Sequence, residues 1–272
     1  MPEYHFETHS PVNLVVEISK GNVHVECRET SESVVTIEGK NADDVLAEQR
    51  GDTITVIEPG RGRIFGDNAL RVDIVVPETS NPAVRTGSAD IQIEGRAGHA
   101  QMRSGSGDCT LDSVDGHLLV ETGSGEIHVD DVHGDLKVKS GSGDVEIGEA
   151  GGNATVSTGS GDVSVDNTYG SAVVKTGSGD LRVGAAHADT SFSTGSGDVS
   201  INLVERGRLT VKGASGDVSI GVKSGVPVWT DISTVSGTIR SDLHGAGQPQ
   251  EGQDHIELRA KTVSGDIALS EV

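Results

Sequence analysis

"TGSGDVSVDNTYGSAVVKTGSGDLRV", residues 158–183, repeats the phrase TGSGD after 18 residues. Acidic residues close this phrase or its variants at the same spacing through much of the chain: Asp90, Asp108, Glu126, Asp144, Asp162, Asp180 and Asp198. The spacing then loosens to 19, 21 and 28 residues, at Asp217, Thr238 and Asp266. A fixed period of this length is typical of a repeat architecture in which each unit packs against its neighbours.

Apolar residues alternate with polar ones at two places in each repeat. One pair follows the acid, as at Leu181 and Val183, and the other precedes TGSGD, as at Ala172 and Val174. This alternation predicts strands with one buried face. The inward parity changes between Val174 and Leu181, so we expect a corner at the intervening TGSGD. A glycine column predicts a second corner with positive φ: Gly98, Gly116, Gly134, Gly152 and Gly170.

Two all-β folds satisfy this pattern. In a parallel β-solenoid (β-helix), each repeat is one coil and like residues stack in ladders about 4.8 Å apart. In an antiparallel β-meander, TGSG is a hairpin turn and each repeat contributes two strands. A single-layer meander of so many strands leaves its apolar face uncovered, whereas a coil covers its own. We therefore predict a single elongated β-solenoid with 18-residue rungs, right-handed by the crossover rule, with the meander as the alternative.

The regularity of the repeats divides the predicted solenoid into three parts. Residues 1–85 contain short β-rich runs punctuated by Gly and Pro, and we expect them to form irregular rungs that cap the solenoid. Residues 86–212 carry the regular repeats. Residues 213–272 carry irregular rungs with a polar loop insertion at 244–255.

Composition and charge limit the functional classes. Only 2% of the residues are aromatic and 38 are glycine, which suits a thin core of small aliphatic side chains. The net charge of −21 argues against binding of nucleic acid or anionic membrane surfaces. The sequence lacks an apolar run of about 18 residues and the features of a signal peptide. We therefore expect a cytoplasmic protein without direct membrane insertion.

The acids form a column in the predicted solenoid. Neighbouring carboxylates about 5 Å apart repel each other by about 1 kcal/mol in water, and by more where water is excluded. The simpler interpretation is that each carboxylate accepts N–H groups of its own glycine-rich corner, at about 1.5–3 kcal/mol per bond. The alternative is a row of Ca²⁺ sites, although Ca²⁺ takes roughly six to eight oxygen ligands. The candidate residues are Asp90, Asp108, Glu126, Asp144, Asp162, Asp180, Asp198 and Asp217.

Other reactive side chains favour structural roles. Cys27 and Cys109 occupy inward positions of their predicted strands and are expected to act as small apolar residues. His99 and His117 share one column, with Asp135 next along it, which predicts a solvent-facing ladder or, as the alternative, a transition-metal site. An identical row of acids is unlike the tuned pair that acid–base catalysis needs. We expect no catalytic residues, and no cofactor unless the acids bind Ca²⁺.

The last residues, VSGDIALSEV, form another repeat-like strand. An uncovered end of a solenoid presents unpaired backbone groups that can template a further strand. We therefore expect self-association through the solenoid ends, giving a homo-oligomer, or a protein partner that caps the last rung.

The order of these features resembles a known family. A strand-rich stretch ending in RVDIVVPE is followed by VRTGSADIQIEGRAGHAQMRSGSGD and then by many TGSGDVSV units. This is similar to the bacterial β-strand-repeat family labelled putative adhesin, or toastrack, over residues 12–272. The resemblance implies a β-solenoid, no known catalytic residues, and a scaffold or assembly role in bacterial envelope-stress or surface systems. Two rival functions stay open: a Ca²⁺-stabilised surface adhesin and, more distantly, a carbohydrate-active β-helix enzyme.

Overall fold

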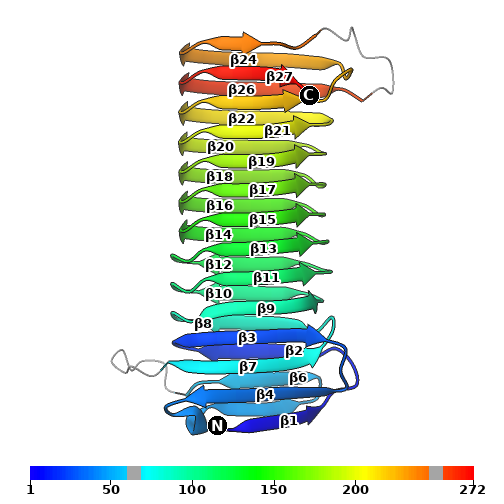
Figure 1. The fold of residues 1–272 in the computed structure, drawn as a ribbon, viewed down its shortest axis with the longest axis vertical. Coiled ribbons are helices and arrows are strands. Elements are labelled where there is room, and N and C mark those ends of the chain that lie inside the picture. The colour runs from blue at the N-terminus through cyan, green and yellow to red at the C-terminus, as the bar shows by residue number, and fades with distance from the viewer. Residues whose placement is uncertain (60–68, 245–253) are drawn as a thin grey trace. The chain divides into compact units, whose positions relative to one another are not determined.

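The computed structural model describes residues 1–59, 69–244 and 254–272 (Figure 1). These residues form strands joined by tight turns, with one short 3-10 helix, η1 (Ala42–Asp44). Within this part of the chain, no helix has the length and apolar character needed to cross a membrane. Contacts group the chain into two compact units, which are described separately: Met1–Gly134 with Val138–Ser140, and Asp135–Lys137 with Gly141–Val272.

The described residues of the first unit form thirteen strands in two sheets. One sheet has the order β1-β4-β7-β3-β9-β11-β13 and the other β12-β10-β8-β2-β6-β5. Pairing within the unit is parallel, except for β1 with β4, β4 with β7, and β5 with β6. The bounds are β1 Glu3–Glu7, β2 Asn13–Ile18, β3 Gly21–Arg28, β4 Glu32–Gly39, β5 Leu46–Arg50, β6 Thr53–Ile57, β7 Leu70–Pro77, β8 Asn81–Thr86, β9 Asp90–Ala97, β10 Ala100–Ser104, β11 Cys109–Val114, β12 Leu118–Thr122 and β13 Ile127–Val132.

The second unit also has two sheets, and its strand pairs from β15 and β16 onward are parallel. Its sheets have the orders β15-β17-β19-β21-β23-β27-β25 and β16-β18-β20-β22-β26-β24, and β14 spans the boundary between the units. The bounds are β14 Leu136–Ser142, β15 Val145–Ala150, β16 Ala154–Ser160, β17 Val163–Thr168, β18 Ala172–Ser178, β19 Leu181–Ala186, β20 Thr190–Ser196, β21 Val199–Val204, β22 Gly207–Ser215, β23 Val218–Val222, β24 Val228–Ser236, β25 Ile239–Ser241, β26 Ile256–Ser264 and β27 Ile267–Glu271.

Parallel pairing places like residues of successive repeats side by side. Thr176 on β18 pairs with Thr158 on one side and Thr194 on the other, and Leu181 on β19 pairs with Val163 in the same way. The expected β-solenoid, with two largely parallel sheets of repeating strands, is confirmed, and the antiparallel meander is wrong. The rung length, the handedness of the coil and the division into three parts stay predictions.

Each strand buries alternate side chains in a thin core. The predicted inward pairs, Ala172 with Val174 on β18 and Leu181 with Val183 on β19, are at most 2% exposed. The bulkier Phe192 on β20 is fully buried. The side chains between the inward positions face outward and are mostly polar, so each sheet has one apolar and one solvated face.

The predicted location of the uncovered edge is wrong. The last strand, β27, lies between β23 and β25, and β26 lies between β22 and β24. The outer edge of the second unit is therefore formed by β24 and β25. Burial explains this order, because β26 carries Ile256, Leu258 and Ala260 in fully buried positions and gains more from cover on both sides. The predicted insertion at 244–255 lies outside the described residues, apart from 244, 254 and 255.

Candidate functional site

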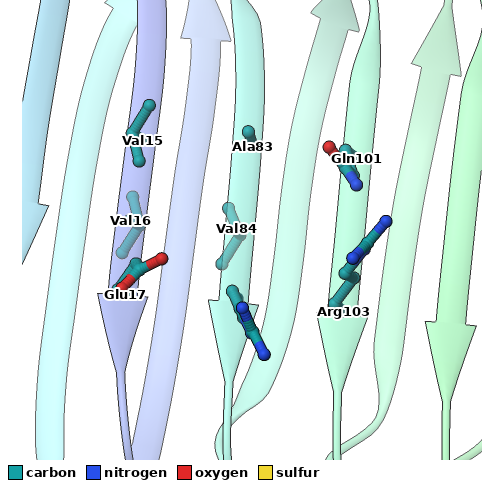
Figure 2. Close-up of a pocket in the computed structure, with 8 residues that line it drawn as sticks. Val15, Val16, Glu17, Ala83, Val84, Gln101 and Arg103 are labelled. Atoms are coloured by element: carbon teal, nitrogen blue, oxygen red, sulfur yellow. The ribbon is translucent and has the colours of Figure 1, made fainter. Parts of the chain in front are cut away.

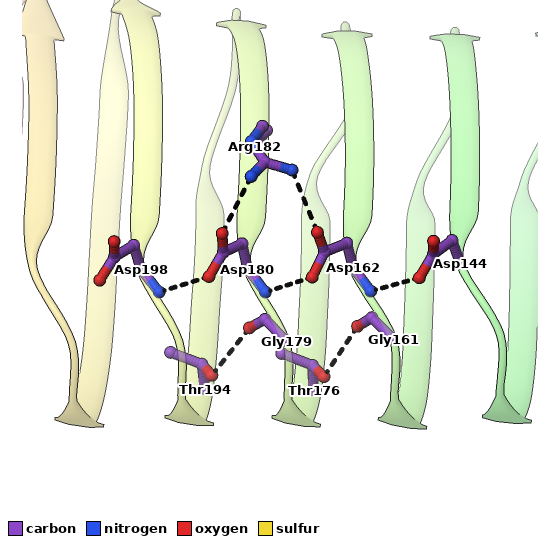
Figure 3. Close-up of polar contacts among 9 residues, drawn as sticks. All are labelled: Asp144, Gly161, Asp162, Thr176, Gly179, Asp180, Arg182, Thr194 and Asp198. Carbon is purple, nitrogen blue, oxygen red and sulfur yellow. Dashed lines mark hydrogen bonds and ion pairs between the residues drawn. The ribbon is translucent and has the colours of Figure 1, made fainter.

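Each TGSGD phrase forms a tight corner between two strands, as predicted. Gly179 has a φ of 141°, and a Cβ there would lie 2.1 Å from the carbonyl oxygen of Gly161 in the preceding repeat. The Thr176 hydroxyl lies 3.3 Å from the Gly161 carbonyl oxygen and 3.2 Å from that of Ser178, and it can donate to either. Figure 3 shows the contact of Thr176 with Gly161 and the equivalent contact of Thr194 with Gly179 one repeat later. Only glycine satisfies both the dihedral angle and the close approach.

The second glycine column differs from its prediction. Its five members do not have positive φ. A Cβ at Gly170 would instead lie 2.2 Å from the carbonyl oxygen of Gly152, and one at Gly134 would lie 2.3 Å from that of Gly116. At Gly134 and Gly170 the close stacking of one backbone on the next therefore leaves no room for a Cβ.

The acids of the TGSGD corners form a hydrogen-bonded row, which we call the acid ladder. The Asp180 N–H donates to Oδ1 of Asp162 at 2.8 Å, and the Asp198 N–H donates to Oδ1 of Asp180 at 2.9 Å (Figure 3). Each carboxylate thus serves the next repeat, whereas a bond within its own corner was expected. The same bond, at 2.8–3.0 Å, runs from Asp108 to Asp90, Glu126 to Asp108, Asp162 to Asp144, Asp217 to Asp198, Asp266 to Asp217 and Thr238 to Asp266.

Hydrogen bonding offsets the repulsion between the stacked carboxylates. A bond to a charged acceptor contributes about 1.5–3 kcal/mol, against about 1 kcal/mol of repulsion per neighbouring pair in water. Arg182 adds ion pairs to Asp162 at 3.2 Å and to Asp180 at 2.9 Å. These pairs are largely exposed, so each contributes about 1 kcal/mol or less. These contributions exceed the repulsion, so the acid ladder is stable as a structural element without a bound cation.

The predicted Ca²⁺ residues fall into two rows, one in each unit. The first unit holds three of them in one row, and the second unit holds five in another. One oxygen of most of these carboxylates already accepts a backbone N–H. No group of three or more His, Cys, Asp or Glu side chains suited to a metal ion occurs among the described residues. Ca²⁺ binding by the ladder stays a prediction. The rows are Asp90, Asp108 and Glu126, then Asp144, Asp162, Asp180, Asp198 and Asp217.

The opposite corners carry a second row of side-chain acceptors. His99 Nδ1 accepts the N–H of His117 at 2.9 Å, and the two rings stack with centroids 5.4 Å apart. Asp135 Oδ1 accepts the N–H of Asn153 at 3.0 Å. Nδ1 of His99 is engaged by the His117 N–H and the two rings stack, so the geometry favours the ladder interpretation.

The two cysteines act as small apolar residues, as predicted. Cys27 and Cys109 are buried and form no disulfide. Burial, with a smaller contribution from nearby carboxylates, raises the pKa of each thiol to about 12. Both therefore stay protonated and poorly nucleophilic at neutral pH.

A polar row on the flank of the second unit was not foreseen. His187 stacks on Tyr169 with ring centroids 4.8 Å apart, and its Nδ1 lies 2.8 Å from Oε2 of Glu205. The Lys223 ammonium lies 3.2 Å from Oε1 of Glu205. Hydrogen bonds from His187 and then Lys223 lower the pKa of the Glu205 carboxyl. Each member contacts its neighbour, so the row is a chain of ring-stacking, hydrogen-bond and ion-pair contacts.

The first unit has a shallow notch on its outward face, with a volume of about 180 Å³ (Figure 2). It arises because Ala83 is short and pairs with the longer Val15 on β2 and Gln101 on β10. Arg103 borders the notch and pairs with Glu121 at 3.3 Å. Sequence reasoning missed this notch because the outward columns follow no repeat.

The outer edge of the second unit is poorly covered. Strand β24 pairs with β26, and the described residues place no strand on its other side. Its Trp229 and Val235 are 53% and 82% exposed. Asp231 is its one charged residue and lies 3.5 Å from Lys261. An exposed edge of this composition can accept a further strand.

A sequence signal for the outer edge lay in the acid ladder itself. Thr238 replaces the acid of TVSGD, and the structure places it last in the ladder of its unit, where its N–H donates to Asp266. Among the described residues no further repeat follows that would need an acceptor. The absence of the acid from one repeat therefore marks the edge.

Comparison with known proteins identifies the repeat family. The family model described as Toastrack DUF4097 matches residues 12–270. Similar solved structures include a putative adhesin from Bacteroides fragilis (12% identity, TM-score 0.39, covering 99% of this chain and 96% of the other) and one from Parabacteroides distasonis (13%, 0.35, 100% and 96%). A putative cell adhesion protein from Clostridium sporogenes is also similar (9%, 0.22, 100% and 99%). None of the curated proteins compared with the chain matches it.

Proposed function

We propose that the chain, which belongs to the toastrack family, DUF4097, is a non-enzymatic scaffold. The function of this family is unknown. The scaffold binds protein partners by adding a strand to the outer edge at β24 and β25. We place this scaffold in a bacterial envelope-stress or surface-associated system, and its family assignment indicates no enzymatic activity.

The observation that supports this proposal is a contrast in hydrogen bonding. The carboxylates of the acid ladder already accept hydrogen bonds, whereas one side of β24 faces no described strand. In the acid ladder, Asp162 and Asp180 each accept the N–H of the next repeat, so these acids share one environment and none is set apart for catalysis. Along β24, one side is paired with β26 and the other side faces no described strand. Strand addition uses such backbone groups for affinity and the alternating side chains for specificity.

The proposal can be tested with a photoreactive amino acid in the full chain. Placed at Ser233, which is exposed on β24, it should give covalent adducts with a small set of discrete proteins in the native bacterium. Ser157 on β16 is the matched control position, because it is also an exposed, outward-facing serine. Each serine pairs with a lysine on the adjacent strand, Lys261 and Lys175 respectively.

The control position lies on an interior strand whose backbone is already paired. Adducts that form at position 233 but not at position 157 would support the proposal. Equal labelling at both positions, or no adducts at position 233, would contradict it.

A further inference from the structure

We propose that one occupant of the outer edge is a second copy of this chain, with β24 pairing antiparallel to β24 of that copy about a two-fold axis at Ile232. This inference rests on the proposed function, because it names the partner of the same edge. Closed two-fold pairing uses one surface twice and needs that surface to be self-complementary. The sequence of β24, VWTDISTVS, meets this requirement.

The facing pairs follow from the register. With Ile232 on the axis, Trp229 faces the second copy's Val235, and Thr230 faces the second copy's Thr234. Aromatic with β-branched residues and threonine with threonine are favourable cross-strand pairs. Trp229 and Val235 share the outward face of β24, and both are exposed. The two most exposed apolar side chains of the strand thus cover each other.

In this register like charges are not directly opposite each other. Asp231 faces the second copy's Ser233, so the one charged residue of β24 does not meet its like. The whole chain carries a net charge of −21, and two copies therefore repel each other at long range. Salt screens that repulsion within about 8–10 Å at physiological concentrations. Association should accordingly tighten as salt rises, which is the reverse of a complex held by opposite charges.

The acid ladder favours antiparallel over parallel addition. In the second unit, the ladder acid of each repeat accepts the N–H of the repeat stacked next to it. Asp217, for example, accepts the N–H of Asp266. Thr238 ends the ladder without a carboxylate. A further parallel coil would lack this acceptor, whereas an antiparallel strand has a different register and does not use it.

The first measurement is sedimentation velocity of the purified full chain over a range of concentrations and at two salt concentrations. We expect a monomer–dimer equilibrium that shifts toward dimer as salt rises. Ser233→Asp places a carboxylate opposite the second copy's Asp231, twice per dimer, and should weaken dimerisation about tenfold. Ser233→Lys places an opposite charge there and should strengthen dimerisation.

Ser157→Asp is the control, since it adds the same charge beside a lysine on an interior strand and should leave dimerisation unchanged. A monomer at all concentrations would overturn the inference, and equal effects of the aspartate and lysine variants would overturn the register. Adducts at position 233 in cells would still support the proposed function when the purified chain is a monomer, so the two failures can be distinguished.

Discussion

The edge strands of the two units differ in charge and pairing. In the first unit, β1 reads EYHFE, and its His5 lies 2.9 Å from Glu32 on β4 and 3.3 Å from Glu3. The other edge strand, β5, reads LAEQR and pairs Arg50 with Glu48 at 2.8 Å. Both strands are antiparallel to their neighbours. Charged side chains along an edge discourage pairing with another chain.

The outer edge of the second unit has less of this protection, although β25 carries Arg240. Strand β24 has one charged residue in nine and exposes Trp229 and Val235, and β25 adds the partly exposed Ile239. Both strands continue the parallel pattern of the repeats. The comparison indicates that charged side chains and antiparallel pairing protect the edge strands of the first unit more than those of the second.

The largest difference between interior and edge should appear in the core. Phe192→Ala removes a fully buried ring and should lower the free energy of unfolding by about 3–5 kcal/mol. Phe6→Ala, in the half-buried edge strand β1, should cost roughly half as much, because less apolar surface is lost. Thermal unfolding followed by circular dichroism would measure both. Equal costs would mean that the edge strand is packed as tightly as the interior.

Replacing a glycine by alanine should cost more stability at a corner of the regular repeats than at an open turn. Gly179→Ala brings a Cβ to 2.1 Å from the Gly161 carbonyl oxygen at a φ of 141°, and should cost about 3 kcal/mol or more. Gly225→Ala has a positive φ of 76° but open space around it, so it should cost only about 1 kcal/mol. Urea denaturation would compare them. A smaller cost at Gly179 than at Gly225 would contradict the close-approach argument.

Substitutions in the acid ladder should change the free energy of unfolding inside the regular repeats but not at the last position of the ladder. Asp180→Ala leaves the N–H of Asp198 without its acceptor and should cost about 1–3 kcal/mol, whereas Asp180→Asn keeps an oxygen in place and should cost less. Thr238→Asp restores the acid at the last position and should change stability by about 0.5 kcal/mol or less. The same denaturation experiment applies. A large gain from Thr238→Asp would indicate that a further repeat does pack there.

Surface ion pairs should have the smallest effect and should not distinguish the regions. The pKa of Glu205 is lowered below its ordinary value of 4.5 by His187 and Lys223, so its stabilisation is present above that value and is lost as pH falls through the lowered pKa. Glu205→Gln should lower stability by about 0.5 kcal/mol or less at neutral pH. The melting-temperature difference from the unsubstituted chain should shrink and vanish as pH falls through the lowered pKa of Glu205. A difference that grows in acid would contradict this.

Local pattern predicted most of the fold, because it depends on alternation within one repeat. The inward pairs Ala172 with Val174 and Leu181 with Val183 fixed the strands and the corner between them. Sequence spacing could not predict which strands become neighbours after Asp217, since steps of 19, 21 and 28 residues do not tell which coil buries more apolar surface. The hydrogen bonds of the ladder acids were predicted within their own corners but join neighbouring repeats. Sequence could not predict this, because the distance between neighbouring coils depends on packing.

The strand order β23-β27-β25 has a consequence for how the chain is assembled during synthesis. Residues 256–271 come after residues 228–241 in the chain, yet they lie between them and the preceding coil. The last coils therefore cannot be added in the order in which they are made. Until residues 256–271 are available, β24 and β25 have no neighbour to pair with in their final positions, and the strand made latest must enter between two segments made earlier.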